Sequence, residues 1–389
     1  MKFRVFMILV AIAMGATSTT TTARPVGQSC PSGQVINNTF SSGAGWDICW
    51  EAESKQGIIF SNIYYNTPAG ISRRVLGEAS VSQIVTEFDD GSTSQFTVTQ
   101  NGLGGDNLVN LTSTDCPNGQ RLQLNGKNVL CQSTKARGYI HKDDVRQRQG
   151  ELLDLFSISK IGGKTYIVRW KFYDSGIIEP MIGLSGKLEK FGSNVNYGWT
   201  VGQNNQIAIG FTNHYFWRLD FDLGETPDDD VAEEIISVPS SDRLKKTIQI
   251  QSMASEAGRS LDYETKRFWR IRDAAIQNSN VGFISYELVL LNYAHQGQGN
   301  SNVSWLGNDF FVTKYNSCER FAVDNPSQNG CGTNITQFVN GENVNEKDLV
   351  TWYRASYHHL PRDEDLNSVP VRWTGFQLLP RDWVSENPL

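Results

Sequence analysis

The six cysteines of this 389-residue chain are the residues whose type and spacing most directly suggest chemistry. They fall into three pairs close in sequence, Cys30 with Cys49, Cys116 with Cys131, and Cys318 with Cys331. In an oxidising compartment the simplest pairing joins each pair as a disulfide, although six cysteines allow about fifteen connectivities. Zinc binding is the alternative, but the C-x-x-C spacing typical of zinc sites does not occur in the sequence.

The N-terminal residues predict export. Lys2 and Arg4 precede an apolar run over residues 5–14, and two small residues follow it. This pattern predicts a signal peptide over residues 1–16 and a secreted, extracellular protein. Residues 17–29 are rich in threonine and are expected to form a disordered lead-in. N-x-[ST] tripeptides predict glycosylation at Asn37, Asn110, Asn302 and Asn334.

Composition limits what the rest of the chain can be. The net charge is −6, only 20% of residues are charged, and 11% are aromatic. The chain is too aromatic to be disordered and too acidic to favour nucleic acid as a partner. After the first 25 residues or so, no apolar run is long enough to predict a membrane span.

The elements that must position any site are predicted to be strands. β-branched and aromatic residues dominate segments 82–88, 165–173, 206–211, 215–223 and 247–253. Turn signals such as Asp90-Gly91 and Asn125-Gly126 separate them. We therefore expect an all-β fold, a large antiparallel β-sandwich in one domain over residues 30–389. Two segments are expected to differ: an acidic solvated loop over residues 228–234 and a short charged helix within 261–275.

Several motifs resemble the catalytic domain of copper amine oxidases. The C-terminal region carries D-L-V-x-W from Asp348, H-x-P-x-x-E-D from His359 and G-F-x-L-x-P from Gly375. The stretch around Arg218 resembles the family's R-[LV]-D-x-D, and residues 138–188 are also similar. The resemblance implies a β-supersandwich, usually a homodimer, with copper and a topaquinone made from a tyrosine. Such an enzyme is a primary-amine oxidase that yields aldehyde, ammonia and hydrogen peroxide.

Residue by residue, the resemblance places different side chains at the family's reactive positions. Lys164 stands where the quinone-forming tyrosine would be, and a lysine cannot become a quinone. Tyr166 lies on the same strand face but roughly 7 Å further along. Val98 stands at the position of the aspartate base, and valine cannot accept a proton. Lys164 could be an amine nucleophile in its own right if desolvated, although a lysine that fills a vacated polar pocket is the simpler interpretation.

The copper site implied by the family needs three histidines. The matching positions are Phe211, Asn213 and His359, and a shift of one residue replaces the first two with Thr212 and His214. Phenylalanine cannot ligate, and asparagine is a poor copper ligand. We therefore expect neither copper nor topaquinone to be bound.

A second metal site implied by the family has its side chains intact. It comprises Asp220, Asp222 and Asp348 together with the carbonyls of Phe221 and Leu349. An all-oxygen set of this kind suits calcium in a structural role. A further peripheral site at Asn340 and Glu342 has weaker support.

Three functions follow as hypotheses. The first is a secreted, non-catalytic homologue of the amine oxidases with an unknown ligand. The second is an active oxidase with a rearranged site that uses His214, His358 or His359 for copper and Tyr166 for the quinone. The third is an extracellular β-sandwich that binds glycans or proteins through Trp199, Trp305 and Trp373.

Overall fold

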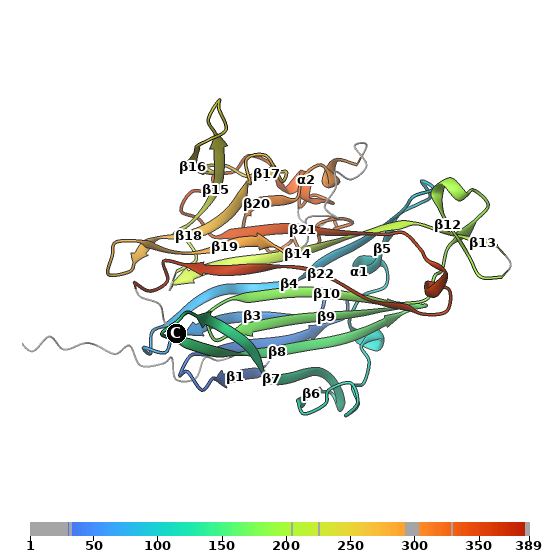
Figure 1. Cartoon of the computed structure of the whole chain (residues 1–389), viewed down its shortest axis with the longest axis horizontal. Helices are drawn as coiled ribbons and strands as arrows, with labels where there is room; N and C mark the ends of the chain where they lie inside the picture. Colours follow the sequence, from blue (N-terminus) through green and yellow to red (C-terminus); the bar gives the residue numbers. More distant parts are fainter. Residues whose placement is uncertain are drawn as a thin grey trace, which may run out of the picture.

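The computed structural model describes residues 30, 33–203, 205–224, 226–291, 303–327 and 330–385. The predicted signal peptide, the lead-in at 17–29 and the glycosylation site at Asn302 lie outside these residues. Two large antiparallel sheets form the body, as Figure 1 shows. The expected all-β sandwich is therefore confirmed. In the described part of the chain, no helix is long and apolar enough to cross a membrane.

The first sheet has nine strands, and eight of them form one continuous path. In spatial order these are β1 (Val35–Thr39), β2 (Gly45–Glu53), β3 (Gly57–Asn66), β4 (Ser72–Phe88), β14 (Phe211–Gly224), β21 (Leu349–His359), β20 (Phe310–Lys314) and β17 (Ala257–Arg259). The short strand β5 (Gln95–Phe96) pairs with β4 outside this path. Strands far apart in sequence, β4, β14 and β21, thus lie side by side at its centre.

The second sheet has ten strands. Their order is β16 (Lys246–Ser252), β15 (Asp230–Pro239), β18 (Phe268–Gln277), β19 (Phe283–Leu290), β22 (Val369–Arg381), β10 (Ile178–Gly186), β9 (Lys164–Tyr173), β8 (Gln147–Ile161), β7 (Lys127–Lys142) and β6 (Gln120–Leu124). A three-stranded sheet comprises β11 (Phe191–Gly192), β13 (Gln206–Ile209) and β12 (Gly198–Val201). The short helices are α1 (Thr97–Gln100), α2 (Ile335–Phe338), η1 (Gly105–Asn107), η2 (Val195–Tyr197), η3 (Ser304–Leu306) and η4 (Asp363–Asp365).

An aromatic core joins the two large sheets. Alternate residues of β9 are buried, which is the period expected of a strand with one face on a core. Phe60 of β3 packs against Trp170 and Phe172 of β9, with ring centroids 5.7 and 6.2 Å apart. Trp217 of β14 packs against Phe376 of β22 at 5.2 Å. Edge-to-face contacts of this kind add to the burial of apolar area.

Both expected exceptions to the strand pattern are wrong over most of their length. The predicted loop at 228–234 becomes part of β15 from Asp230 onward, and the predicted helix at 261–275 contains most of β18. The physical reason is a shared ion-pair cluster. Glu233 is buried and accepts hydrogen bonds from Arg270 at 2.5 Å and Arg272 at 2.8 Å. The charges of the two segments therefore neutralise one another across adjacent strands.

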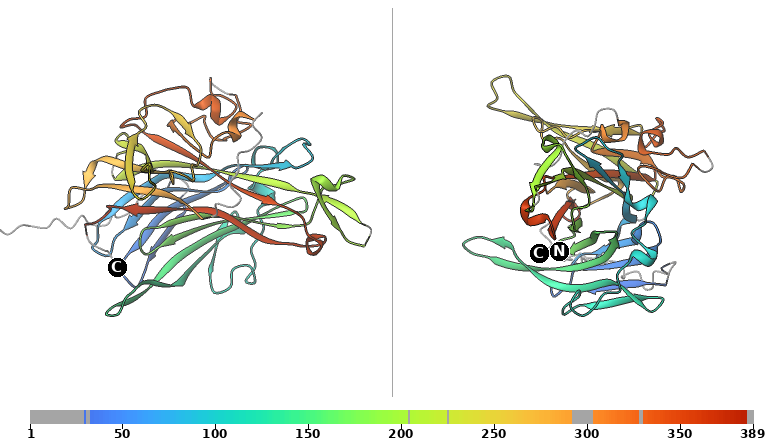
Figure 2. Two further views of the ribbon diagram at one scale, coloured as in Figure 1. Left: turned by 45° about the horizontal axis from the view of Figure 1, so that its top comes forward. Right: turned by 90° about the vertical axis from the view of Figure 1, so that its right-hand side faces the viewer.

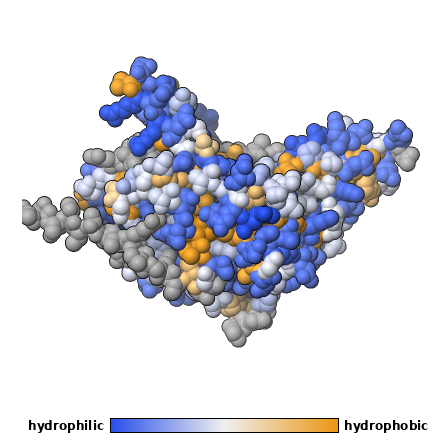
Figure 3. Space-filling view, turned by 90° about the horizontal axis from the view of Figure 1, so that it is seen from below, coloured by the Kyte–Doolittle hydropathy of each residue, from blue (hydrophilic) through white to orange (hydrophobic). Residues whose placement is uncertain are grey.

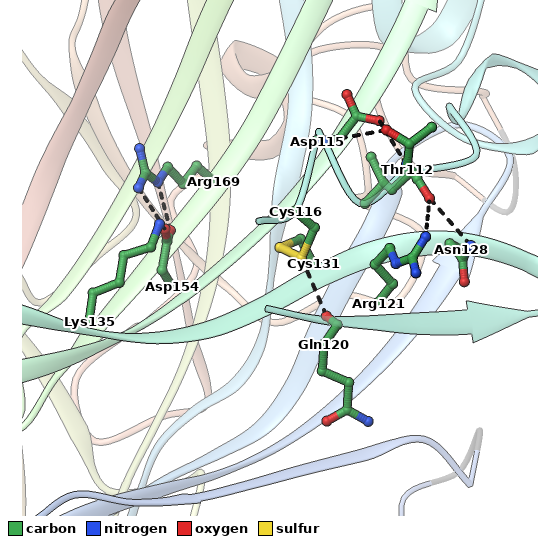
Figure 4. The surroundings of a disulfide bond; sticks show 11 residues. Thr112, Asp115, Cys116, Gln120, Arg121, Asn128, Cys131, Lys135, Asp154 and Arg169 are labelled. Carbon is green, nitrogen blue, oxygen red and sulfur yellow. Dashed lines mark hydrogen bonds and ion pairs between the residues drawn. A yellow bond between two sulfur atoms is a disulfide. The ribbon is translucent and has the colours of Figure 1, made fainter. Parts of the chain in front are cut away.

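The predicted disulfide pairing is confirmed. Cys30–Cys49, Cys116–Cys131 and Cys318–Cys331 are bonded, with Cα–Cα distances of 5.3, 5.7 and 6.1 Å. Figure 4 shows the second of these next to β6 and β7. In the same view Asp154 of β8 accepts from both Lys135 and Arg169, so a fully buried carboxylate is paired twice.

Two extensions project from the body. One is the β15–β16 hairpin, and the other contains β12 and β13 (Figures 1 and 2). Every residue of β16 is exposed. Seen from below, the described surface is mostly hydrophilic, with a smaller apolar area near its middle (Figure 3). Most of the large apolar side chains of the described residues are buried in the core.

Candidate functional site

Lys164 is the first residue of the buried row on β9. Tyr166, Val168, Trp170 and Phe172 continue this row, so strand alternation places the lysine on a face that is otherwise apolar and aromatic. Only 9% of Lys164 is exposed. Burial lowers the pKa of its ammonium group, and the Glu189 carboxylate opposes that shift.

Phe211 meets Lys164 from the opposite sheet, and His359 packs against Phe211. They are directly paired across β14 and β21, so their side chains lie on the same face. Their ring centroids are 5.0 Å apart, and the Lys164 Nζ atom lies 5.6 Å from the Phe211 ring. The structure therefore brings together the sequence-predicted quinone position and two of the copper positions.

His359 faces a carboxylate of η4. It is buried, and its Nε2 atom lies 3.2 Å from Asp365 Oδ2 but makes no hydrogen bond within the described residues. Burial lowers the pKa of His359, although Asp365 opposes this, so the imidazole favours its neutral form. Asn213 is also buried, and its carbonyl oxygen accepts a hydrogen bond from the Thr86 hydroxyl at 2.7 Å.

Val98 lies beside this group on α1. It is fully buried, and its backbone N–H donates to Gln83 at 2.9 Å. The preceding residue, Thr97, lies 3.4 Å from the Tyr166 hydroxyl. Tyr166 is buried too, which raises the pKa of its phenol to about 12. The position of the family's base thus carries a buried aliphatic side chain.

These residues do not fit copper. The three family positions present a phenyl ring, an amide already hydrogen-bonded through its oxygen, and one imidazole beside a carboxylate. Copper in proteins needs several nitrogen or sulfur donors in one cage. Lys164 cannot be converted to a quinone, because that chemistry needs a phenol. No step that depends on copper or a quinone is derived for this site.

His214 lies on the other face of the sheet. It is three residues from Phe211 along a regular strand, and an odd offset reverses the side-chain direction. Its Nε2 atom lies 3.0 Å from Glu87, and its Nδ1 atom lies 2.8 Å from Ser356 and 3.2 Å from Arg354. His214 and His359 therefore point away from each other and cannot share a metal.

His358 does not complete a rearranged site either. It shares a sheet face with His214, because it pairs with Thr212. It is largely exposed, however, and its Nε2 atom lies 2.9 Å from Asp89. Each of these two histidines thus has its own carboxylate partner, which accounts for it without a metal.

Asp220, Asp222 and Asp348 form a carboxylate cluster at the far end of β14. Phe221 pairs with Leu349 at the start of β21, which brings Asp348 next to the two strand aspartates. One oxygen from each of the three carboxylates can be chosen such that all lie within 4.8 Å of one another. The sequence-predicted metal ligands therefore converge.

The cluster fits a divalent cation. Asp220 Oδ1 and Asp348 Oδ1 are buried and have no hydrogen-bond partner among the described residues. Burial, together with the nearby carboxylates, raises the pKa of Asp348 to about 6 and that of Asp220 well above its usual range. Unpaired buried carboxylates are costly, and a hard cation relieves that cost. Calcium bound there would tie β14 to β21.

Two arginines and a glycine border the same cluster. Arg74 lies 2.9 Å from Asp222, and Arg218 lies 3.7 Å from Asp220, so each guanidinium contacts one member of the set. Gly77 leaves the necessary space, because a Cβ atom there would come within 2.4 Å of Asp222 Oδ2. Arg218 belongs to the R-L-D-x-D motif of the sequence, whereas no local pattern marks Arg74 or Gly77, which only strand pairing places here.

The weaker peripheral site has most of its groups already paired. The Asn340 carbonyl oxygen accepts from the Glu342 backbone, and its amide donates to the Glu342 carboxylate at 3.3 Å. Glu342 also lies 3.5 Å from Lys314. These contacts explain both side chains without a metal.

The three tryptophans proposed for glycan binding lie on separate elements. Trp199 of β12 is 53% exposed, but Trp305 of η3 is half-buried and packs against Phe96 and Phe216. Trp373 of β22 lies under the Arg169 guanidinium, 5.4 Å from its ring. They do not form one flat platform. Of the described glycosylation sites, Asn37 and Asn110 are exposed, and Asn334 is half-buried and caps α2 through its side-chain oxygen.

The fold and its two sites define an all-β protein of packed antiparallel sheets, with a buried lysine at one end of β14 and an acidic cluster at the other. A family model described as the copper amine oxidase enzyme domain matches residues 125–389. The chain belongs to the copper amine oxidase family.

Relatives and solved structures agree. The primary amine oxidase of Pisum sativum is 24% identical over 412 residues, covering 92% of this chain and 60% of the relative. The primary amine oxidase of Arthrobacter sp. (strain P1) is 21% identical over 412 residues and covers 95% of this chain and 63% of the relative. The chain thus spans about 60% of the length of these relatives.

The copper-containing benzylamine oxidase of Hansenula polymorpha has the same fold, with a TM-score of 0.77 and 16% identity over 100% of this chain and 64% of that structure. The lysyl oxidase of Pichia pastoris matches with a TM-score of 0.76 and 18% identity over 88% of this chain and 52% of that structure.

Proposed function

We propose that this protein is a non-oxidising member of the family, a secreted binding or structural protein on an amine-oxidase scaffold. The observation that carries the proposal is the contact group of Lys164, Phe211 and His359. The family's reactive positions converge as their fold requires, yet they supply an amine, a phenyl ring and a single imidazole. A phenol ring and a multi-nitrogen cage are both needed for copper and quinone chemistry, and neither fits here.

Activity tests this proposal directly. The purified chain, supplied with Cu²⁺ and oxygen, is incubated with a primary amine, and hydrogen peroxide is measured against an amine-free blank. We expect no amine-dependent peroxide. Amine-dependent peroxide above the blank would overturn the proposal.

We further propose that calcium binds at Asp220, Asp222 and Asp348 and stabilises the scaffold. The unpartnered oxygens of Asp220 and Asp348 support this, as does the raised pKa of both groups in the absence of a cation. A ligand that binds only the folded state stabilises it by about 2.7 kcal/mol at 100 times its dissociation constant. The melting temperature of the protein should therefore be higher with calcium than with a chelator.

Matched variants separate a specific site from general ion effects. Asp220→Asn and Asp348→Asn should each abolish the calcium-dependent rise in melting temperature. Asp144→Asn, on the exposed β7–β8 turn, removes the same charge elsewhere and should retain it. An equal response in all three variants would contradict the calcium site.

We also propose that the protein is a homodimer outside the cell. The projecting β15–β16 hairpin supports an interface, because Ile248 and Ile250 are 69% and 54% exposed on alternate positions of β16. Isolated exposed apolar residues are ordinary, but a row on one face of a projecting strand is suited to contact with a partner. The three disulfides are typical of proteins exported to an oxidising compartment.

A further inference from the structure

The Lys164 side chain ends in a small cavity between the sheets. Apolar walls come from Phe88, Leu184, Leu188, Ile209 and Phe211, and the rim carries Lys187, Glu189 and Lys190. The cavity has a volume of about 20 Å³, which is room for little more than one water molecule. A buried amine therefore borders an apolar space that admits only a very small molecule.

The ammonium form of Lys164 is poorly satisfied in this setting. It offers three donors, but its nearest acceptors are Gln95 Oε1 at 3.4 Å and Glu189 Oε2 at 3.8 Å. Both distances exceed the 2.7–3.2 Å or so of a good N–H···O hydrogen bond. Its other close neighbours are the rings of Phe88 and Phe211, at 5.9 and 5.6 Å.

A lysine in such a place is suited to nucleophilic chemistry. The neutral amine has a free lone pair, and burial favours this form by lowering the pKa of Lys164. Lys187 offers a contrast on the same rim, because it is exposed to solvent. The two amines thus share an entrance but differ in solvation.

We propose that Lys164 captures formaldehyde in this cavity as a reversible Schiff base. The amine lone pair attacks the carbonyl carbon, and the nitrogen–carbon bond forms as the carbonyl π bond breaks. The resulting carbinolamine loses its oxygen as water, which carries away both amine hydrogens and leaves a C=N bond. No oxidant or reductant is needed. This proposal shares one premise with the proposed function: Lys164 occupies the position where the family forms its quinone.

Reductive trapping tests this capture. The full chain is treated at neutral pH with formaldehyde and cyanoborohydride, which reduces the imine to a stable methyl group, and is then mapped by peptide mass. At low conversion, methylation of Lys164 should exceed that of Lys187 at least several-fold. Benzaldehyde, which is too large for the cavity, should reverse that order.

A variant that removes the Glu189 charge leaves Lys164 itself in place, so the test does not depend on whether a Lys164 variant folds. Glu189→Gln retains the hydrogen bond to the Gly163 backbone but removes the carboxylate that favours the ammonium. It should increase trapping at Lys164 and leave Lys187 unchanged. Equal labelling of the two lysines by formaldehyde, or no labelling of Lys164, would overturn the proposal. Neither outcome depends on peroxide, so failure here is distinct from failure of the proposed function.

Discussion

The amine of Lys164 and the ring of Phe211 show how two side chains can change the chemistry of a conserved framework. At the residue scale, both positions keep their place in the fold, because strand alternation and cross-strand pairing set where they point. What differs is the donor set. A phenyl ring offers copper no lone pair, and an amine offers oxygen no phenol to hydroxylate. At these two positions the difference from the family is therefore chemical and not architectural.

His214 provides a test of buried polar chemistry at the same scale. Burial lowers its pKa below the ordinary 6.5, and Arg354 acts in the same direction, while Glu87 and Asp309 oppose the shift. The unfolded chain thus binds this proton at a higher pH than the folded one. The contribution of His214 to the free energy of unfolding is therefore fully present above pH 6.5 and is lost as the pH falls below that value.

Replacing this imidazole should flatten that dependence. In His214→Gln, the free energy of unfolding measured by denaturant titration should change less steeply below pH 6.5, by up to about 1.4 kcal/mol per pH unit. Ser356→Ala keeps the titrating ring and should keep the slope. Identical slopes in the wild type and His214→Gln would contradict the assignment.

At the scale of elements, β15 and β18 pair as neighbouring antiparallel strands and also share one buried carboxylate. Glu233 accepts from Arg270 and Arg272, so its loss leaves two guanidinium groups without their shared acceptor. We expect Glu233→Gln to lower the free energy of unfolding by roughly 1–3 kcal/mol. Chemical denaturation checks this value.

Glu264→Gln is the matched control for that change. Its partner Arg243 is 3.1 Å away, but both side chains are largely exposed, and such pairs contribute about 0–1 kcal/mol. If the two variants were equally stable, the buried cluster would not hold the strands together.

The same two strands show where sequence patterns reach their limit. Segments 165–173 and 215–223 were predictable as strands because β-branched and aromatic residues dominate them. In β18 the arginines alternate with buried Trp269 and Ile271, and that charge suggested a helix. Only the partner strand, which supplies Glu233, shows why arginines are stable there.

The disulfides were predictable because the two cysteines of each pair are near each other in sequence.

At the scale of the whole molecule, the sites depend on topology. The acidic cluster joins residues of β14 to Asp348, more than a hundred positions later, and pairing of β14 with β21 makes the contact. The family motifs predicted these ligands. They did not predict Arg74, Gly77 or the cavity rim at Lys187, because no local pattern marks a residue that acquires its role through a distant strand.

The projecting hairpin carries a prediction at this scale. Ile248→Lys with Ile250→Lys places two charges on the exposed apolar face of β16 and should convert a dimer to a monomer. Light scattering coupled to gel filtration measures the mass. Val145→Lys, at an 89% exposed position on another turn, should leave the mass unchanged. A dimer that persists in the double variant would place the interface elsewhere.

The central claim is that this scaffold cannot form a quinone. It is tested most directly by loading the metal-free protein with Cu²⁺ in air and measuring the mass of the β9 peptide that contains Lys164 and Tyr166. We predict an unchanged mass, with both side chains intact. An oxidised tyrosine at position 166, with the visible absorption of a quinone, would contradict the account.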